Sequence, residues 1–339
     1  MLGSGPAELA LERARAALSK SGFLFQDDWA DILDERDEGV HAWTTVNYLL
    51  GKLNSTSSSD GAGNGDKKNG DDDKFVGVMD LGGASVQVVF RSDEELETPP
   101  VLTDAERLAG QTQPAAPDVV HARFLNRSYR VLTKSHLGHG LFDFTKKLYA
   151  QFYRDGVLEK GNPCFRKEKH FPRKTLRLGN LGGSEESRVV SITGNGEFDK
   201  CVASCERVLL AHDVPAASAV KAAGNTEFYA FAYFYDRTVG LGLPASPTKE
   251  ELVALGNKLC GPAVTGMDTT GIAGTDEACA EFSYIYALLK RISSDFDPAT
   301  GVTFKFVQYI EGHMLGWSLG TVLDQLPSVA KVQFAEPLP

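Results

Sequence analysis

The chain has 339 residues, of which 42% are hydrophobic, and a formal net charge of −10 at pH 7. This composition supports a core and excludes wholesale disorder, and the length predicts two domains or one large α/β domain. The acidity argues against binding to nucleic acid, which requires lysine and arginine on phosphates, but not against a nucleotide whose phosphates are screened by a divalent cation.

The first third of the chain alternates predicted helices, loops and strands. Residues 1–20 lack the apolar core of a signal peptide, and no run is long enough to span a membrane. An amphipathic helix is predicted over 7–19. A second helix is predicted to begin near Gly39, because four residues share one helical face. These residues are Val40, Trp43, Asn47 and Leu50.

Charged loops and further elements follow. Residues 54–74 are of low complexity and are expected to be a disordered insert, and residues 93–118 are expected to be a second loop. The alternation of helices and strands predicts the α/β class. The remaining predictions are strands over 75–79 and 85–90, a strand and turn within 123–141, helices over 142–156 and 198–213, an aromatic-rich helix within 225–244, helices over 249–260 (N-cap Thr248) and 281–292, a strand over 301–310 and a helix within 312–326.

The stretch VMDLGGASVQVVF reads as a hairpin with unusual residues at its tip. A turn through Gly82 and Gly83 allows backbone N–H groups to approach a phosphate, and Ser85 adds a hydroxyl donor. Asp80 is suited to hold a hydrated divalent cation, and Gln87 to orient a water nucleophile. The alternative is an ordinary solvent-facing turn, since Asp and Gly are common turn residues. The hairpin is not a Walker loop, because no G-K-[ST] follows.

Several segments resemble, in family order, the motifs of the apyrase family, the nucleoside triphosphate diphosphohydrolases. DEGVHAWTTVNYLLGKL (37–53) resembles E-E-G-x-x-G-W-x-T-x-N-Y-L-x-G, with Ala42 in place of glycine. DLGGASVQ (80–87) resembles D-L-G-G-A-S-T-Q, with Val86 in place of threonine. GWSLGTVL (316–323) resembles the C-terminal G-W-x-L-G motif. Further similar segments are SHLGHGL (135–141), NPCF (162–165) and FYAFAYFY (228–235).

The resemblance implies an α/β, actin-like (RNase H-like) fold of two lobes with the nucleotide between them. The family's first phosphate-binding loop, of the D-x-G-S-[ST]-x-x-R type, and its A-T-A-G-x-R-like segment do not occur. We therefore expect an N-terminally truncated member that lacks most of the first lobe. Residues 1–30 would be a remnant of that lobe, 31–300 the second lobe, and 301–339 a return segment whose apolar face lacks a partner. Hydrolysis by such a chain is expected to be weak or absent.

The resemblance also implies metal-dependent hydrolysis of the terminal phosphate of nucleoside tri- and diphosphates. Glu38 is then the general base, kept ionised by the dipole of the helix it begins; taken alone, it would be an ordinary helix-start acid. Asp80 would bind Mg²⁺ or Ca²⁺ through water, and Gln87 would lie near the attacking water. The phosphate-binding residues would be Gly82, Gly83, Ala84 and Ser85.

Aromatic residues also match the family. Trp43 and Trp317 correspond to family tryptophans and are interpreted as packing residues near the cleft. Phe234 or Tyr235 would stack on the nucleobase, although aromatic residues in a helix are more often part of a core. The two histidines of SHLGHGL form an H-x-x-H pattern, which is interpreted as structural or surface.

Five cysteines leave two interpretations open, disulfides or buried thiols, because they show no zinc-binding spacing. NPCF resembles half of a family disulfide, which implies a pair of Cys164 with Cys201. Cys260 and Cys279 bracket a short excursion and are expected to pair. This leaves Cys205 as a free or buried thiol.

Disulfides would place the protein in the secretory lumen (ER or Golgi) or outside the cell. Sequons at Asn54 and Asn126 are typical of glycoproteins but also arise by chance. A membrane anchor would belong only to a longer form. Two other classes stay open, a related actin-like phosphatase such as an exopolyphosphatase, and a non-enzymatic nucleotide-binding fragment.

Overall fold

The computed structural model describes residues 4–53, 75–91, 118–124, 127–178, 186–210, 227–262, 275–293 and 302–329. The predicted inserts at 54–74 and 93–118 lie outside these stretches, except that Asp118 begins a strand. The sequon residues Asn54 and Asn126 also lie outside them. No helix within these stretches is long and apolar enough to cross a membrane.

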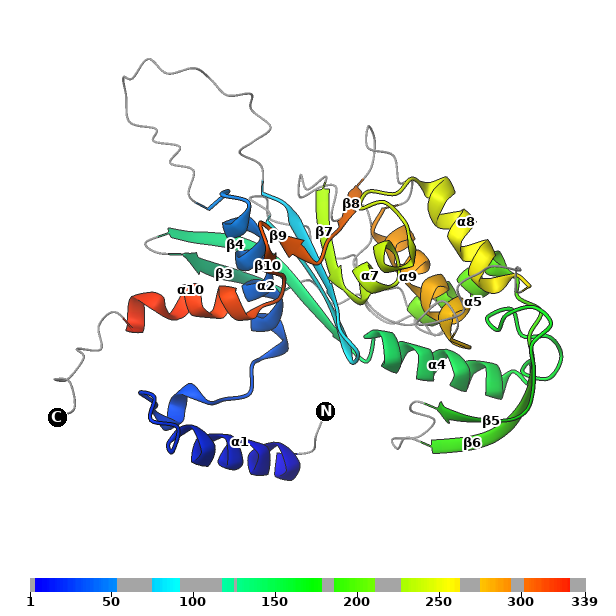
Figure 1. Cartoon of the computed structure of the whole chain (residues 1–339), viewed down its shortest axis with the longest axis horizontal. Helices are drawn as coiled ribbons and strands as arrows, with labels where there is room; N and C mark the ends of the chain where they lie inside the picture. Colours follow the sequence, from blue (N-terminus) through cyan, green and yellow to red (C-terminus); the bar gives the residue numbers. More distant parts are fainter. Residues whose placement is uncertain are drawn as a thin grey trace, which may run out of the picture.

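A six-stranded mixed sheet forms the centre of the molecule (Figure 1). Its strand order is β3-β4-β2-β1-β7-β8, in which β1, β7 and β8 are parallel and the other neighbours are antiparallel. The predicted α/β class is therefore confirmed. The strand bounds are β1 Gly77–Leu81, β2 Ser85–Arg91, β3 Asp118–Phe124, β4 Arg127–Leu137, β7 Glu227–Ala232 and β8 Thr303–Phe306.

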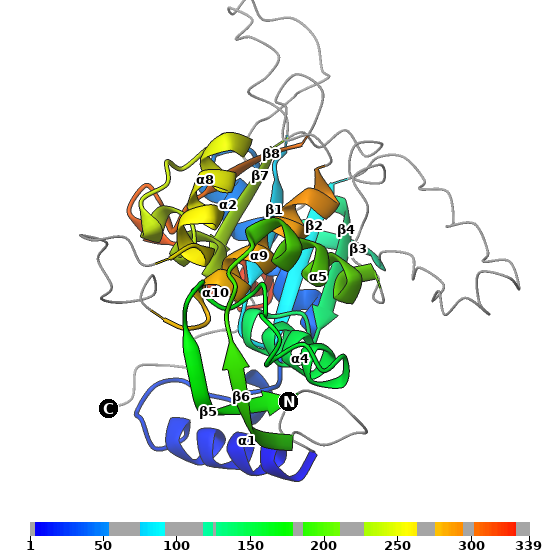
Figure 2. The same cartoon turned by 90° about the vertical axis from the view of Figure 1, so that its right-hand side faces the viewer.

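Helices cover both faces of the sheet and produce three layers (Figures 1 and 2). On one face, Val78 and Val89 share a core with Trp43 of α2, and α10 packs against α2. On the other face, Met79 and Val88 share a core with α4, α5, α8 and α9. The bounds are α2 Glu35–Leu49, α4 Leu141–Arg154, α5 Phe198–Leu210, α8 Lys249–Cys260, α9 Ala278–Ile292 and α10 Ser318–Val329. Smaller elements are α1 Ser4–Leu18, η1 Asp27–Trp29, α7 Tyr233–Asp236, η2 Val239–Leu241, and the strand pairs β5 His170–Leu178 with β6 Glu186–Thr193 and β9 Tyr309–Ile310 with β10 His313–Met314.

Local capping decides where two helices begin. The helix α2 starts at Glu35 rather than near Gly39, because the Asp34 carboxylate accepts the N–H of Arg36 and caps its first turn. The predicted N-cap of α8 is confirmed, since Thr248 and Glu251 form a complete capping box.

The aromatic-rich segment is a strand followed by one helical turn, not a helix. Residues 227–232 form β7, which lies between β1 and β8 and pairs with both in parallel. The chain then turns at Ala232, whose φ is +55°, into the short α7. Aromatic residues are favoured in a pleated, buried strand, and here tertiary pairing outweighed the helical pattern.

The C-terminal segment packs against the rest of the fold. Phe304 and Phe306 of β8 are buried in the main core, and Leu323 of α10 is buried against the α2 layer. The expected lack of an apolar partner is therefore wrong for β8 and α10. The assignment of 301–339 to a first lobe stays a prediction.

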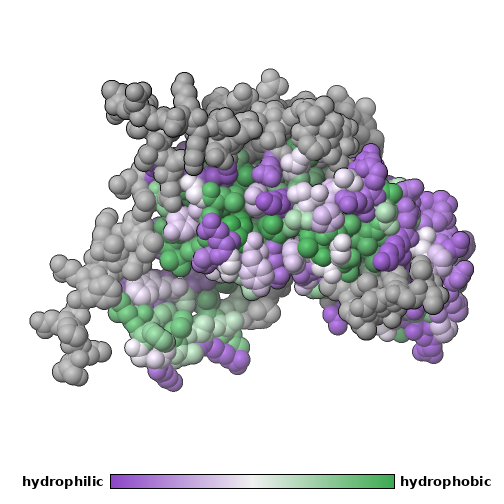
Figure 3. Space-filling view, turned by 45° about the horizontal axis from the view of Figure 1, so that its top comes forward, coloured by the Kyte–Doolittle hydropathy of each residue, from purple (hydrophilic) through white to green (hydrophobic). Residues whose placement is uncertain are grey.

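The N-terminal segment exposes apolar side chains. The helix α1 lies apart from the sheet (Figure 1), and Phe23 is 82% exposed, with Leu24 and Ile32 both at 60%. Hydrophobic atoms are visible at the surface of this part of the molecule in the lower left of Figure 3. The assignment of residues 1–30 to a first lobe also stays a prediction.

Candidate active site

The tip of the β1–β2 hairpin directs its carbonyls into the protein. The N–H of Gly82 donates to the carbonyl of Ser85 at 3.0 Å and closes the turn. The carbonyls of Gly82 and Gly83 accept N–H groups from the start of α4 at 2.9 and 3.0 Å, and that of Ala84 accepts the N–H of Gly138 at 2.7 Å. Within the described stretches, the N–H groups of Gly83 and Ala84 donate to no carbonyl. Such N–H groups in a glycine turn are suited to bind an anion.

Gly140 determines how closely α4 approaches the tip. It precedes α4, and a Cβ at this position would overlap backbone atoms of Gly83 and Ala84. We expect Gly140→Ala to displace the tip and to lower the free energy of unfolding by about 1–3 kcal/mol, as overpacking does. Chemical denaturation measures this change. Gly316→Ala is the matched control, because no atom lies within 4 Å of its Cβ. Equal stability of the two variants would contradict the expectation.

Glu38 lies in the first turn of α2, where the helix dipole stabilises a carboxylate. Its side chain is half-buried, and its Oε2 accepts a hydrogen bond from Gln87 Nε2 at 3.1 Å. The fold thereby joins the two segments that carry the strongest family resemblance. The predicted base and the predicted water-orienting amide are in direct contact.

Gly39 allows α2 to lie directly on the sheet beside Gln87. A Cβ on Gly39 would lie 2.8 Å from Val89 Cγ2, closer than real Cβ atoms approach, and 3.0 Å from Thr133 Oγ1, a very tight contact. Any larger residue would lift the first turn of the helix from β2 and β4. The glycine of the 37–53 segment therefore serves helix–sheet packing, which brings Glu38 to Gln87.

Ser135 is a site residue that the sequence did not reveal. It lies opposite Gln87 in the antiparallel register of β2 and β4. Gln87 Nε2 lies 2.8 Å from Ser85 Oγ, 3.2 Å from Ser135 Oγ and 3.1 Å from Glu38 Oε2, and its two hydrogens are shared among these three acceptors. Ser135 begins the segment SHLGHGL, but only the strand register assigns it to the site. These contacts fix the direction in which the Gln87 amide points.

Asp80 is buried at the end of β1, directly opposite Gln87 in the hairpin register. Burial, and secondarily the nearby charge of Glu38, raises the pKa of Asp80 to about 7. Two carboxyl groups therefore interact at the hairpin tip. A carboxyl with a raised pKa beside backbone N–H groups that are suited to bind an anion is typical of a functional site.

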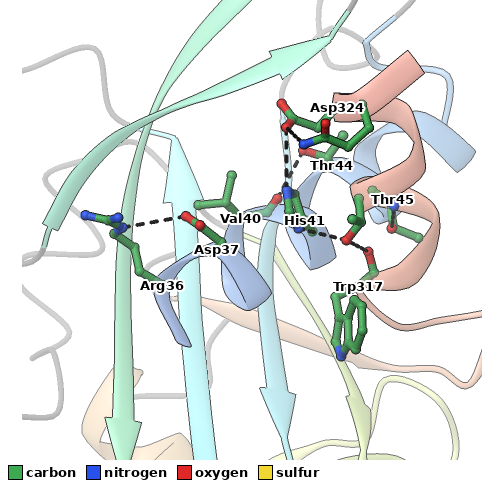
Figure 4. Close-up of polar contacts among 11 residues, drawn as sticks. Arg36, Asp37, Val40, His41, Thr44, Thr45, Trp317 and Asp324 are labelled. Carbon is green, nitrogen blue, oxygen red and sulfur yellow. Dashed lines mark hydrogen bonds and ion pairs between the residues drawn. The ribbon is translucent and has the colours of Figure 1, made fainter. Parts of the chain in front are cut away.

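The helix α10 holds α2 from the side away from the sheet (Figure 4). His41 Nδ1 lies 2.8 Å from Thr321 Oγ1, and His41 Nε2 lies 3.9 Å from Asp324 Oδ2. The N–H of Gly320 donates to Thr45 Oγ1 at 2.8 Å. Burial lowers the pKa of His41, while the charge of Asp324 opposes this shift. The helix that carries Glu38 is thus fixed between the sheet and α10.

The two predicted packing tryptophans have different environments. Trp43 is fully buried and stacks on Phe75 at 5.4 Å between ring centroids, which agrees with a packing role. Trp317 precedes α10 and is 37% exposed, and its role as a packing residue near the cleft stays a prediction. Figure 4 shows its ring turned away from the His41–Asp324 contact.

Phe234 is not available to a nucleobase. It is fully buried and lies 6.4 Å from Phe306 between ring centroids, because α7 directs it into the main core. Tyr235 is half-buried, and its role stays a prediction. The histidines His136 and His139 are both buried, edge to face at 6.0 Å, so of the two interpretations the structural one holds.

The structure contains both expected disulfides, Cys164–Cys201 and Cys260–Cys279. Cys205 is a free, buried thiol, and its sulfur lies within 4.8 Å of both sulfurs of the first pair. Burial raises the pKa of this thiol. Because disulfide sulfurs are poor metal ligands, we interpret this group of three as part of the core.

The model of the GDA1/CD39 (nucleoside phosphatase) family matches residues 1–336. The chain belongs to the GDA1/CD39 family. An actin-like α/β fold agrees with a solved structure described as nucleoside triphosphate hydrolases from Neospora caninum. The two align with a TM-score of 0.63 and 16% identity, over 96% of this chain and 70% of the other. At this identity the likeness establishes the fold alone.

Two curated relatives have names that specify different substrates, a diphosphate for one and a triphosphate for the other. A guanosine-diphosphatase of Candida albicans is 26% identical over 96% of this chain and 56% of its own length. A human protein named ectonucleoside triphosphate diphosphohydrolase 6 is 26% identical over 95% of this chain and 59% of its own length. The chain therefore spans somewhat more than half the length of these relatives.

Proposed function

We propose that this chain hydrolyses the terminal phosphate of nucleoside tri- and diphosphates by attack of water, at the low rate that its sequence predicts. One observation carries the proposal, the 3.1 Å hydrogen bond from Gln87 Nε2 to Glu38 Oε2. It brings a carboxylate and an amide together beside a turn with two available N–H groups. The names of the two relatives, a guanosine-diphosphatase and a triphosphate diphosphohydrolase, support this class of substrate.

Each residue has a role that follows from its chemistry. Glu38 removes the proton from the attacking water, and Gln87 orients that water through its amide. The N–H groups of Gly83 and Ala84, together with the hydroxyl of Ser85, donate to the phosphate oxygens. Donors fixed before the reaction stabilise charge that develops in the transition state.

The hairpin tip fits a divalent cation, although the ion itself is a proposal. Asp80 and Glu38 repel one another, and burial raises the pKa of Asp80, so a nearby cation would stabilise both carboxylates. Carboxylates and waters are the ligands that Mg²⁺ and Ca²⁺ prefer. We assign Asp80 to hold the cation through water. When bound, the cation would screen the charge of the substrate phosphates.

Two further assignments are part of the proposal. Tyr235 is the remaining candidate for stacking on the nucleobase, since Phe234 is in the core. The two disulfides favour an oxidising compartment, either the secretory lumen or the outside of the cell.

Phosphate release by the purified chain tests the proposal. With Mg²⁺ or Ca²⁺ we expect slow release of phosphate from ATP and ADP, loss of this turnover after addition of EDTA, and recovery when the ion is returned. Preferential cleavage of polyphosphate over ATP would instead favour an exopolyphosphatase. Stabilisation against heat by nucleotide, without any turnover, would favour a non-enzymatic binding protein.

A further inference from the structure

A lysine of α4 lies against the turn that supports the hairpin tip. A Cβ on Gly138 would lie only 2.6 Å from Lys147 Nζ, so the ammonium group touches this glycine. Gly138 has a φ of +76° and donates its N–H to the carbonyl of Ala84 at 2.7 Å. One residue therefore separates the Lys147 ammonium from the loop with the available N–H groups.

Within the stretches that the structure describes, no hydrogen bond or ion pair joins the Lys147 ammonium to another residue. The charge of Asp143 acts on it, but the Asp143 carboxylate is paired with the adjacent Lys146, whose Nζ lies 2.9 Å from Asp143 Oδ1. Its side chain is half-buried, and burial lowers the pKa of Lys147. A partly desolvated cation that forms no ion pair is unfavourable, and a bound anion would offset this cost.

The negative charges at the site would be offset by a cation such as Lys147. The chain has a net charge of −10, and the carboxyl groups of Glu38 and Asp80 lie at the same tip. Phosphates that approach this tip are repelled by those carboxylates, and two backbone N–H groups carry only partial charges. A lysine is a compact point charge with three donors, suited to phosphate oxygens.

We propose that Lys147 supplies a positive charge to the anion site at the β1–β2 tip and there binds the phosphate chain of a nucleotide. This inference rests on the proposed function, because it assigns a further residue to the same site. The inference about Lys147 requires only that the site binds an anion, whereas the proposed function also requires hydrolysis. Its test therefore uses an anion that needs no metal.

The test measures pyrophosphate binding in EDTA, at constant ionic strength, by calorimetry and by the shift of the thermal midpoint. For Lys147→Gln we expect the dissociation constant to rise roughly tenfold, the effect of losing one close charge interaction. Lys146→Gln is the matched control, with less than about a twofold change, because its ammonium is already paired. Lys147→Arg is expected to keep most of the affinity. In hydrolysis assays, KM should rise more than kcat falls.

The outcomes separate this inference from the proposed function. Equal pyrophosphate binding by the wild type and Lys147→Gln, or no binding by the wild type, would overturn the role of Lys147 even if ATP is hydrolysed. Binding that depends on Lys147 without any turnover would support the inference and reject the hydrolase. Loss of an unpaired charge should not lower the ligand-free thermal midpoint. If Lys147→Gln is unstable, Lys147→Met retains the apolar stem and serves in its place.

Discussion

Substitution of Glu38 by glutamine is expected to lower kcat for ATP or ADP by roughly 10²–10⁴-fold, the usual contribution of a general base. Glutamine keeps the size of the side chain and can still accept a hydrogen bond from Gln87, but it cannot take a proton from water. KM should change little, because the role proposed for Glu38 is to act on the attacking water rather than on the nucleotide. Steady-state phosphate release measures both constants.

Asp37→Asn is the matched control for Glu38→Gln. Asp37 is the neighbouring acid in the same helical turn, and its carboxylate lies 3.6 Å from Arg36. Exposed pairs of this kind contribute about 0–1 kcal/mol, so turnover should stay within a few-fold of the wild type. Turnover by Glu38→Gln equal to that of the control would reject Glu38 as the base. A pH–rate profile of the wild type independently measures the pKa of the group that acts as the base.

The metal-free protein is expected to lose stability as the pH rises from about 4 to about 7. The folded protein retains a proton on Asp80 up to its raised pKa of about 7, while the unfolded chain releases it near the ordinary value of 3.8. Folding therefore takes up a proton between these values. The contribution of Asp80 is complete below pH 3.8 and lost above pH 7. Its slope reaches about 1.4 kcal/mol per pH unit, or roughly 4 kcal/mol over the range.

Denaturant unfolding at several pH values, in EDTA, measures this slope. Asp80→Asn should remove the Asp80 contribution, because the amide does not titrate. Glu38→Gln should reduce it, because the charge of Glu38 is the second cause of the raised pKa. Addition of Mg²⁺ at pH 7 should restore stability to the wild type but not to Asp80→Asn. An identical slope in the wild type and Asp80→Asn would show that Asp80 has an ordinary pKa.

The local chemistry of several elements was readable from the sequence. The hairpin tip with Gly82 and Gly83 follows from glycines placed between two apolar strands, and the start of α8 follows from Thr248 and Glu251. These features depend on neighbours within a few residues, so the sequence contains their cause. The start of α2 was misjudged by four residues, because the periodic apolar face begins after the Asp34 cap.

Other features depend on pairing between distant segments. The aromatic stretch became a strand because β1 and β8 lie on either side of it, and this buried Phe234 while Tyr235 stayed half-buried. Ser135 is part of the candidate site only because the register of β4 against β2 places it opposite Gln87. The sequence did not indicate a role for Lys147, since a lysine on a helix is usually solvated.

The sequence by itself determined the chemical groups of this site and the family to which they belong. Asp80, the glycine turn, Gln87 and Glu38 follow from short segments in which spacing and residue type suffice. Only the tertiary structure decided that Glu38 contacts Gln87, that Ser135 joins them, and that Lys147 lies against Gly138, which supports the hairpin tip. The physical reason is distance along the chain. Residues 49 positions apart come into contact only because α2 packs on the sheet at Gly39, and no local pattern encodes that packing.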